Sequence, residues 1–284
     1  MAPRTEIGMP LSALLDGITD IPTEKDLLID DIALDSRDVG PGSCFLALRG
    51  SRENGLSYAI EAITRGAVVV LAEDAVGTQT FRVPVFERIP IRENLGLIAK
   101  RFFGDPSVGL KVFAITGTNG KSTVAHIVAQ ALDGLGRSCG YIGTLGAGRL
   151  DSLVPLGVTT PDPISLNRWL SNLVGDRVEN VALEASSHAL VQNRLTGVAV
   201  NTAVFTNLGH DHLDYHGNTK AYADSKRLLF GYSGLAAAVI NIDDSLGASI
   251  ARTLGADIEL WSCATAKRSR PVEVQARVTA ANVE

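Results

Sequence analysis

Residues 111–136 read KVFAITGTNGKSTVAHIVAQALDGLG, and this stretch decides the fold class. KVFAIT is a short apolar run typical of a buried strand, GTNG is a glycine-rich loop, and the segment from Lys121 is typical of a helix that stops in glycines. Because strands alternate with helices along the rest of the chain, we predict an α/β fold with a mostly parallel sheet covered on both faces. The further strands are expected at 180–185, 201–207, 236–241 and 258–262.

The loop TGTNGKST between that strand and that helix is suited to phosphate. Gly117 and Gly120 allow backbone conformations that aim amide N–H groups into a concavity, and the helix N-terminus adds its dipole. Lys121 would then reach the outer phosphates, and the hydroxyl of Ser122 would hold Mg²⁺. The match to the general pattern G-x-x-x-x-G-K-[ST] is incomplete, because Ile115 stands where that pattern has its first glycine. A glycine-rich turn that only starts a helix is the alternative.

The residues before the phosphate loop are predicted to form a small α/β unit of their own. A Gly-Asp-Pro sequence ends its last helix, so we predict one domain at 1–106 and a second at 107–284. The strands and helices of the first unit are expected at 30–37, 43–50, 58–67, 68–73 and 91–104, with the first two strands joined by a Pro-Gly turn at 41–42.

The composition is that of an ordinary globular protein of 284 residues, with 45 % hydrophobic and 20 % charged residues. A net charge of −5 argues against a general nucleic-acid binder or a basic membrane-surface protein. The sequence has no apolar run of about 18 residues, so we expect no membrane insertion. The N-terminus lacks a signal core, and Cys44, Cys139 and Cys263 form no zinc pattern. We therefore expect a cytoplasmic protein, and a monomer.

Two further sets of polar side chains follow predicted strands, where a nucleotide-binding sheet places metal ligands. Glu184 ends one strand, although an exposed strand-end glutamate is an equal alternative. The next strand is followed by GHDHLDYHG (209–217), whose spacing does not say which histidine binds a metal. Lys226 lies further on, and its ordinary interpretation is a solvated helix lysine. The candidates in the histidine segment are Asp211, His212, Asp214 and His216.

Taken together, these segments resemble the Mur ligases of peptidoglycan synthesis, and within them the type that adds the third residue of the stem peptide. The uridine-binding N-terminal domain of that family is resembled by LDSR (34–37) and PGSCFLALRG (41–50). In the rest of the chain the resemblance is carried, in order and spacing, by ITGTNGKST (115–123), TTPDP (159–163), ALEASSHALVQNR (182–194), FTNLGHDHLDYHG (205–217) and YADSK (222–226).

The resemblance implies an ATP-dependent amide ligase that uses Mg²⁺. In that family ATP phosphorylates the free D-glutamate carboxylate of UDP-N-acetylmuramoyl-L-alanyl-D-glutamate. The amine of a diamino acid then attacks the acyl phosphate, which releases ADP and phosphate. The added amino acid is not readable from these residues, and we expect meso-2,6-diaminopimelate, with L-lysine as the alternative. Since anions have to approach one another, metal ions and Lys121 would screen their charges.

The resemblance also assigns roles to single residues. His210 occupies a variable position and is not expected to be a ligand, and segment 51–53 matches a further UDP-sugar contact only weakly. The implied catalytic residues are Lys121, Glu184, His212 and Lys226, and the implied Mg²⁺ ligands are Ser122, Glu184, His212 and Lys226. The ATP loop would comprise Gly117, Thr118, Asn119, Gly120, Lys121, Ser122 and Thr123. Leu34 and Ser36 would contact the uridine end, and Thr159, Thr160, Ser186, Gln192 and Arg194 the muramoyl-dipeptide.

Lys226 falls where the family carries a carbamylated lysine. Addition of CO₂ to the neutral amine changes its charge from +1 to −1 and supplies an oxygen ligand, which removes the objection to a lysine beside a metal ion. The modification requires the amine to lose its proton, and burial near other cations would favour that loss.

The sequence differs from the family in one respect and leaves three alternative functions open. Mur ligases have a third, C-terminal domain, so we expect this chain to end within the ATPase domain and to be inactive as a ligase by itself. A folylpolyglutamate synthase shares the GTNGK-type loop but not the N-terminal unit or the TTPDP segment. A ligase of the same family that adds L-lysine, and a non-catalytic nucleotide- or UDP-sugar-binding protein, are the others.

Overall fold

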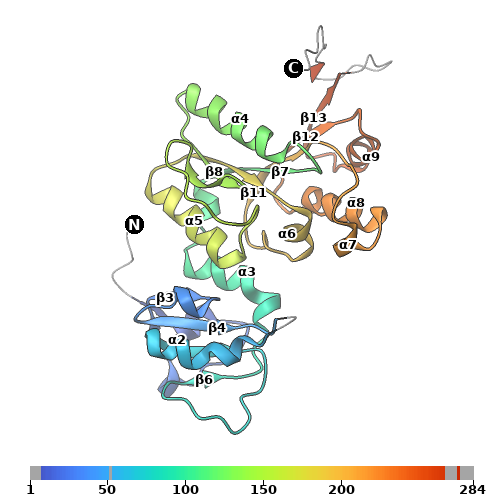
Figure 1. Cartoon of the computed structure of the whole chain (residues 1–284). Coiled ribbons are helices and arrows are strands. Elements are labelled where there is room, and N and C mark those ends of the chain that lie inside the picture. Colours follow the sequence, from blue (N-terminus) through green and yellow to red (C-terminus); the bar gives the residue numbers. More distant parts are fainter. Residues whose placement is uncertain (1–7, 51–52, 266–273, 276–284) are drawn as a thin grey trace. The chain divides into compact units, whose positions relative to one another are not determined.

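The computed structural model describes residues 8–50, 53–265 and 274–275, so two positions of the weak 51–53 match lie outside it. The described residues form two compact units, drawn in sequence colours in Figure 1. The first is drawn from Met1–Asp105 and Pro163–Arg168, and the second from Pro106–Asp162 and Trp169–Glu284. The roles predicted for the two domains stay predictions.

The first unit is built on a parallel sheet with the described strand order β3-β4-β5-β6. Every residue of β4 is buried, which is the pattern of a strand covered on both faces. Its helix α3 places Ile91, Leu95 and Ile98 on one buried face, at the spacing of successive helical turns. The elements are β1 (Met9–Pro10), α1 (Leu11–Leu14), β2 (Leu28–Ile29), β3 (Asp31–Ala33), β4 (Ser43–Ala47), α2 (Ala59–Arg65), β5 (Ala67–Ala72), β6 (Val85–Phe86) and α3 (Ile91–Phe102).

The strand predicted at 30–37 is shorter than expected. After Ala33 the chain turns into a short 3-10 helix at Ser36–Asp38, because the Asp35 carboxylate accepts a hydrogen bond from the Arg37 backbone N–H. This extra reversal lets β3 and β4 run parallel, so the turn at 41–42 does not join a hairpin.

The second unit contains a sheet with the described strand order β14-β13-β12-β11-β7-β10-β8-β9, parallel throughout except for the β8–β9 pair. The four strands predicted after the phosphate loop are confirmed to within three residues at each end. The strands are β7 (Lys111–Thr116), β8 (Cys139–Gly143), β9 (Gly146–Arg149), β10 (Asn180–Glu184), β11 (Val200–Phe205), β12 (Ala237–Asn241), β13 (Glu259–Ala264) and β14 (Val274–Gln275).

Helices cover both faces of this sheet (Figure 1). Helix α4 packs through Ala125 and Ala129 onto the face that carries Tyr141 and Ala182. On the opposite face of β8, the side chain of Leu173 in α5 occupies the space above Gly140. The helices that lie in or reach this unit are α4 (Lys121–Gly134), α5 (Pro163–Gly175), α6 (Ser187–Val191), α7 (Leu213–His216), α8 (Thr219–Arg227) and α9 (Ser245–Thr253). Among the described residues, none of the helices combines the length and apolarity needed to traverse a bilayer.

Strand β7 lies between β10 and β11, and this neighbourhood positions the site. Glu184 at the end of β10 pairs with Ile115, and Phe205 at the end of β11 pairs with Thr116. Since all three strands run in one direction, the segments that follow them emerge at the same edge of the sheet.

Asp244 anchors one of these segments and a helix at the same time. One carboxylate oxygen accepts hydrogen bonds from the backbone N–H groups of Leu246 (2.8 Å) and Gly247 (3.3 Å) at the start of α9. The other oxygen accepts from the N–H of Leu208 at 2.7 Å, in the chain that follows β11. This carboxylate therefore joins α9 to the edge of the sheet.

We expect Asp244→Ala to lower the free energy of unfolding by about 1–2 kcal/mol, because a helix cap and a loop anchor are lost together. Asp244→Asn keeps one oxygen acceptor and should lose less. Asp224→Ala removes exposed ion pairs with Lys220 and Arg227 and should change stability by about 0.5 kcal/mol or less. Urea unfolding of the three variants checks this order, and equal losses for Asp224→Ala and Asp244→Ala would contradict it.

Candidate functional site

The loop after β7 is closed tightly against the segment after β11. Gly117 adopts φ +149°, and a Cβ there would lie 1.8 Å from the Thr206 hydroxyl, so only glycine fits. The backbone N–H of Thr118 donates to the Asn207 carbonyl at 2.8 Å, and that of Asn119 donates to the Asn207 side-chain oxygen at 3.0 Å. Gly120 at φ +82° precedes the first residue of α4.

Two lysine side chains converge on one carbonyl oxygen of this loop. The Lys226 Nζ atom donates to the Gly117 oxygen at 2.8 Å, and the Lys121 Nζ atom donates to the same oxygen at 3.1 Å. Lys121 also donates to the Thr118 carbonyl at 2.9 Å. The loop thus gathers two cationic groups at the place where the sequence predicts phosphate.

Lys226 is buried, with 1 % of its surface exposed, rather than solvated on the face of α8. Its ammonium lies 4.2 Å from the centroid of the Tyr222 ring. Burial and, to a smaller extent, repulsion from Lys121 together lower the pKa of Lys226 to about 7, against the opposing attraction of Asp211. Burial also lowers the pKa of Lys121, against the attraction of Glu184 and Asp211. The amine of Lys226 therefore reaches its neutral form near neutral pH.

Glu184 is fully buried at the end of β10, which the strand-end pattern alone did not decide. One carboxylate oxygen, Oε2, accepts from the Ser122 hydroxyl at 2.9 Å and from the Thr144 hydroxyl at 3.3 Å. The other, Oε1, accepts from the Thr144 backbone N–H at 2.9 Å and from the phenol of Tyr141. Ser122 and Glu184 thus offer adjacent oxygen donors, which fit Mg²⁺ because that ion prefers oxygen ligands and keeps several waters.

The histidines of segment 209–217 have different surroundings in the structure. His212 adopts φ +51° just before α7, its side chain is half exposed, and its Nε2 lies 3.5 Å from the Asp211 carboxylate. The ring of His212 packs edge-on against His188, with centroids 4.7 Å apart. His216 instead shares a hydrogen bond of 3.0 Å with the Ser187 hydroxyl. Within the described ranges, no group of three or more His, Cys, Asp or Glu residues is arranged to hold a metal ion. A second metal site at His212 stays a prediction.

The residues predicted to hold the muramoyl-dipeptide in this unit lie beside Glu184. The Thr160 hydroxyl donates to the Glu184 carbonyl at 2.7 Å. Arg194 donates to the Thr160 carbonyl at 2.6 Å and to the Gln192 side-chain oxygen at 2.7 and 3.0 Å. Ser186 caps α6 and lies 3.2 Å from the Thr160 hydroxyl.

Thr159 and the uridine-end residues complete the predicted set. The hydroxyls of Thr159 and Thr144 lie 3.0 Å apart. In the first unit, the Ser36 hydroxyl donates to Glu61 at 2.9 Å, and Leu34 packs against the core. The substrate-binding roles of all these residues remain predictions.

Sequence reasoning missed several residues that build this site. The Tyr222 phenol and the Thr118 hydroxyl lie 3.0 Å apart, and the Thr118 hydroxyl accepts from the Gly209 N–H at 2.8 Å. This chain of contacts joins the glycine-rich loop after β7 to the histidine segment and to α8. Tyr222 lies in the YADSK match, whereas Tyr141 and Thr144 carry no sequence signal that points to Glu184.

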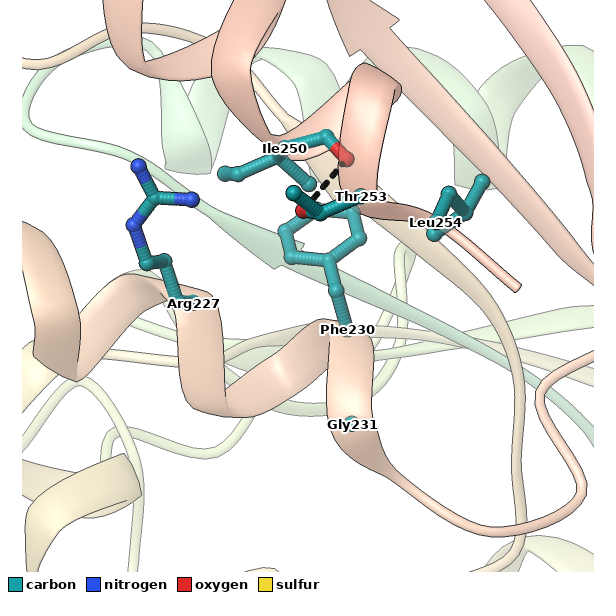
Figure 2. Close-up of a pocket in the computed structure, with 6 residues that line it drawn as sticks. All are labelled: Arg227, Phe230, Gly231, Ile250, Thr253 and Leu254. Carbon is teal, nitrogen blue, oxygen red and sulfur yellow. Dashed lines mark hydrogen bonds between the residues drawn. The ribbon is translucent and has the colours of Figure 1, made fainter.

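A pocket of about 150 Å³ lies between the end of α8 and α9 (Figure 2). Arg227 lies on one side of it and donates to the Ser249 hydroxyl at 2.9 Å. No predicted site residue lines this pocket, so we assign it no part in the site. Its lining residues are Arg227, Phe230, Gly231, Ile250, Thr253 and Leu254.

Comparison with known proteins assigns the chain to a family. Residues 115–283 match the Mur ligase middle domain, and residues 28–103 match the catalytic domain of the Mur ligase family. The chain belongs to the Mur ligase family. The predicted family and α/β fold class are therefore confirmed.

Curated relatives of this Mur ligase chain include two bacterial proteins named UDP-N-acetylmuramoyl-L-alanyl-D-glutamate–2,6-diaminopimelate ligase. The protein of Alkalilimnicola ehrlichii is 44 % identical over 252 residues, covering 85 % of this chain and 51 % of the relative. That of Pseudomonas aeruginosa is 44 % identical over 230 residues, covering 80 % and 47 %. The chain thus spans about half the length of the curated relatives it matches.

Solved structures agree with the Mur ligase assignment. A structure titled as a UDP-N-acetylmuramoyl-L-alanyl-D-glutamate–2,6-diaminopimelate ligase is 31 % identical with a TM-score of 0.76, covering 92 % of this chain and 54 % of that chain. MurF from Acinetobacter baumannii is 19 % identical with a TM-score of 0.64, covering 90 % and 54 %, and indicates a shared fold only.

The buried Lys226 makes stability depend on pH. Because its pKa falls from 10.5 to about 7 on folding, the unfolded chain binds more protons than the folded one between these values, and stability rises with pH there. We expect wild type to gain about 2 kcal/mol relative to Lys226→Met between pH 7 and pH 9. Below pH 7 the difference should level off.

Denaturant unfolding at several pH values, in CO₂-depleted buffer, measures this gain. Lys220→Met is the matched control, since the Lys220 side chain is 88 % exposed and should give no pH-dependent difference. A constant difference between wild type and Lys226→Met would mean that Lys226 keeps its ordinary pKa.

Proposed function

We propose that this chain carries the nucleotide- and substrate-binding parts of an ATP-dependent amide ligase of peptidoglycan synthesis. The ligase joins meso-2,6-diaminopimelate to UDP-N-acetylmuramoyl-L-alanyl-D-glutamate, the reaction that names its 44 % identical relatives. The observation that carries the proposal is the meeting of Lys121 and Lys226 at the Gly117 carbonyl, beside the paired oxygens of Ser122 and Glu184.

The loop receives the phosphates of ATP. Lys121 exchanges its hydrogen bonds to the Gly117 and Thr118 carbonyls for bonds to phosphate oxygens, which satisfy its charge better. The ammonium then lies beside the phosphoryl group as it passes to the D-glutamate carboxylate. Catalysis of this step is mainly a matter of position and charge, and Lys121 supplies both.

Ser122 and Glu184 hold Mg²⁺ beside the loop. The Ser122 hydroxyl, which here donates to the Glu184 Oε2 atom, would give up that hydrogen bond so that both oxygens could serve as ligands. When bound, Mg²⁺ screens the negative charges of the phosphates and of the substrate carboxylate.

Lys226 is the carbamylated residue in this proposal. The neutral amine attacks the carbon of CO₂, an N–C bond forms and one proton leaves, so that an N-carboxylate remains. Burial and the neighbouring Lys121 support this step, because together they lower the pKa of Lys226 to about 7. The product would supply oxygen ligands, and with His212 it would hold the second Mg²⁺ ion.

The dipeptide end of the substrate binds beside Glu184. Arg194 is held in place by Gln192 and by the Thr160 carbonyl, which leaves its guanidinium to pair with a substrate carboxylate. Thr159 and Ser186 add hydroxyl groups on the same side. Leu34 and Ser36 take the uridine end.

Product analysis tests the proposed reaction in a protein that contains this chain and has the length of its relatives. We expect ADP and phosphate to appear only when UDP-N-acetylmuramoyl-L-alanyl-D-glutamate is present, and amide to form with meso-2,6-diaminopimelate. Amide formed with L-lysine instead would identify the alternative ligase, and turnover with a folate would identify a folylpolyglutamate synthase. Absence of phosphate release with every acceptor would leave a non-catalytic binding protein. The 284-residue chain alone is expected to bind substrates without forming amide.

Lys121→Ala should lower the rate of phosphate release by several orders of magnitude, because the main clamp on the transferred phosphoryl group is lost. Calorimetry on the 284-residue chain should also show weaker ATP binding. Lys220→Ala is the control, since this lysine is exposed and forms an ion pair with Asp224 on the surface of α8. Near-normal turnover by Lys121→Ala would mean that the loop is wrongly assigned.

Carbamylation of Lys226 should be visible directly. In ¹³C-bicarbonate buffer we expect one protein-bound carbamate carbon resonance from wild type and none from Lys226→Ala. The resonance should grow as the pH rises through about 7, because the neutral amine is the reactive form. Short carboxylates should partly restore the activity of Lys226→Ala. A carbamate resonance that persists in Lys226→Ala would place the modification elsewhere.

A further inference from the structure

Tyr141 is a buried phenol that the reaction described above does not use. It lies on β8, with its ring packed in the apolar layer between the sheet and α4. Its hydroxyl donates to the Oε1 atom of Glu184. Burial raises the pKa of this phenol, and the hydrogen bond to Glu184 raises it further, so the hydroxyl keeps its proton and acts as the donor.

The sheet brings these two groups together across neighbouring strands. Tyr141 pairs in register with Ala182 on β10, two residues before Glu184, so the side chains of Tyr141 and Glu184 lie on one face. The long phenol spans the distance between the two positions. Glu184 at the end of β10 is therefore in contact with Tyr141 in the middle of the neighbouring strand β8.

Gly143 supplies the space for this contact. A Cβ at Gly143 would lie 2.3 Å from the Glu184 Oε1 atom and 2.6 Å from the Tyr141 hydroxyl oxygen. Any other residue would push the carboxylate or the phenol aside. Tyr141 and Gly143 on β8 and Glu184 on β10 are therefore all needed for the hydrogen bond between the phenol and the carboxylate.

The two carboxylate oxygens of Glu184 have different kinds of hydrogen-bond partner. Oε1 accepts from the phenol of Tyr141 on β8 and from the Thr144 backbone N–H just after β8. Oε2 meets two hydroxyls, those of Ser122 and Thr144, which can rotate. One oxygen is thus anchored, and the other is free to exchange a hydroxyl partner for a cation.

We infer that Tyr141 is a positioning residue that holds the Glu184 carboxylate so that Oε2 faces the cation shared with Ser122. This inference rests on the proposed function, since it takes Glu184 as a Mg²⁺ ligand. Groups that orient a metal ligand affect affinity by about 10- to 100-fold. The phenol acts through its hydrogen bond to Glu184.

Binding measurements on the 284-residue chain test the inference without turnover. In the presence of ADP, Tyr141→Phe should raise the Kd for Mg²⁺ about tenfold, while ADP affinity in EDTA stays within about twofold. Tyr232→Phe is the matched control, because it removes another phenol that burial affects, and it should leave the Kd unchanged. A Tyr141→Phe variant that loses thermal stability but keeps its Kd for Mg²⁺ would overturn the inference.

Infrared spectra of the metal-free chain give a second readout. The difference between wild type and Tyr141→Phe should contain a carboxylate stretching band, and that band should vanish when the comparison is made in a Glu184→Gln background. Absence of the band in the first comparison would also overturn the inference. Failure of wild type to bind Mg²⁺ with ADP would instead refute the proposed function, and the band would then decide the Tyr141 contact alone.

A fluorinated tyrosine covers the case in which Tyr141→Phe does not fold. 3-Fluorotyrosine at position 141 keeps the ring and the hydroxyl and donates a stronger hydrogen bond. It should shift the Glu184 band relative to wild type and keep or lower the Kd for Mg²⁺. An unchanged band and an unchanged Kd would together contradict the positioning role.

Discussion

Two lysine ammonium groups that donate to the same backbone oxygen determine the electrostatics of this site. The ammonium groups of Lys121 and Lys226 both donate to the Gly117 carbonyl, where a neutral oxygen cannot balance two positive charges. Such an arrangement is relieved by losing a proton, by adding a carboxylate to one amine, or by receiving an anion. The proposed chemistry uses all three, so the repulsion between the two ammonium groups favours the binding of phosphate and the carbamylation of Lys226.

The order of the strands determines which segments surround this loop. Because β7 lies between β10 and β11, a glycine loop, a buried carboxylate and a histidine segment leave the sheet side by side. Neighbouring segments then fix one another: Asn207 closes the loop, and Asp244 holds the chain after β11. Side-chain oxygens of Asn207 and Asp244 thus accept hydrogen bonds from backbone N–H groups of neighbouring segments, and apolar layers lie behind the sheet.

Local pattern predicted the strands that end at the site, because β7, β10, β11 and β12 are apolar runs bounded by polar turns. It did not predict β8 and β9, since CGYIG and GAGR are rich in glycine and poor in β-branched residues. The contact of Tyr141 with Glu184 could not be foreseen, because β8 and β10 are neighbours in space and not in sequence. The burial of Lys226 was equally hidden, since a helix lysine is usually exposed and only tertiary packing turns this one inward.

A substitution at His212 can change both the imidazole side chain and a strained backbone conformation. The backbone of this residue lies in the left-handed region at φ +51°, where a residue with a Cβ is strained by about 1 kcal/mol relative to glycine. Alanine at this position would remove the imidazole and keep the strain, whereas glycine would remove both. Differences between these two variants therefore report on the backbone, and the loss they have in common reports on the ring. An alanine variant alone would therefore report on the imidazole and leave the contribution of the backbone unmeasured.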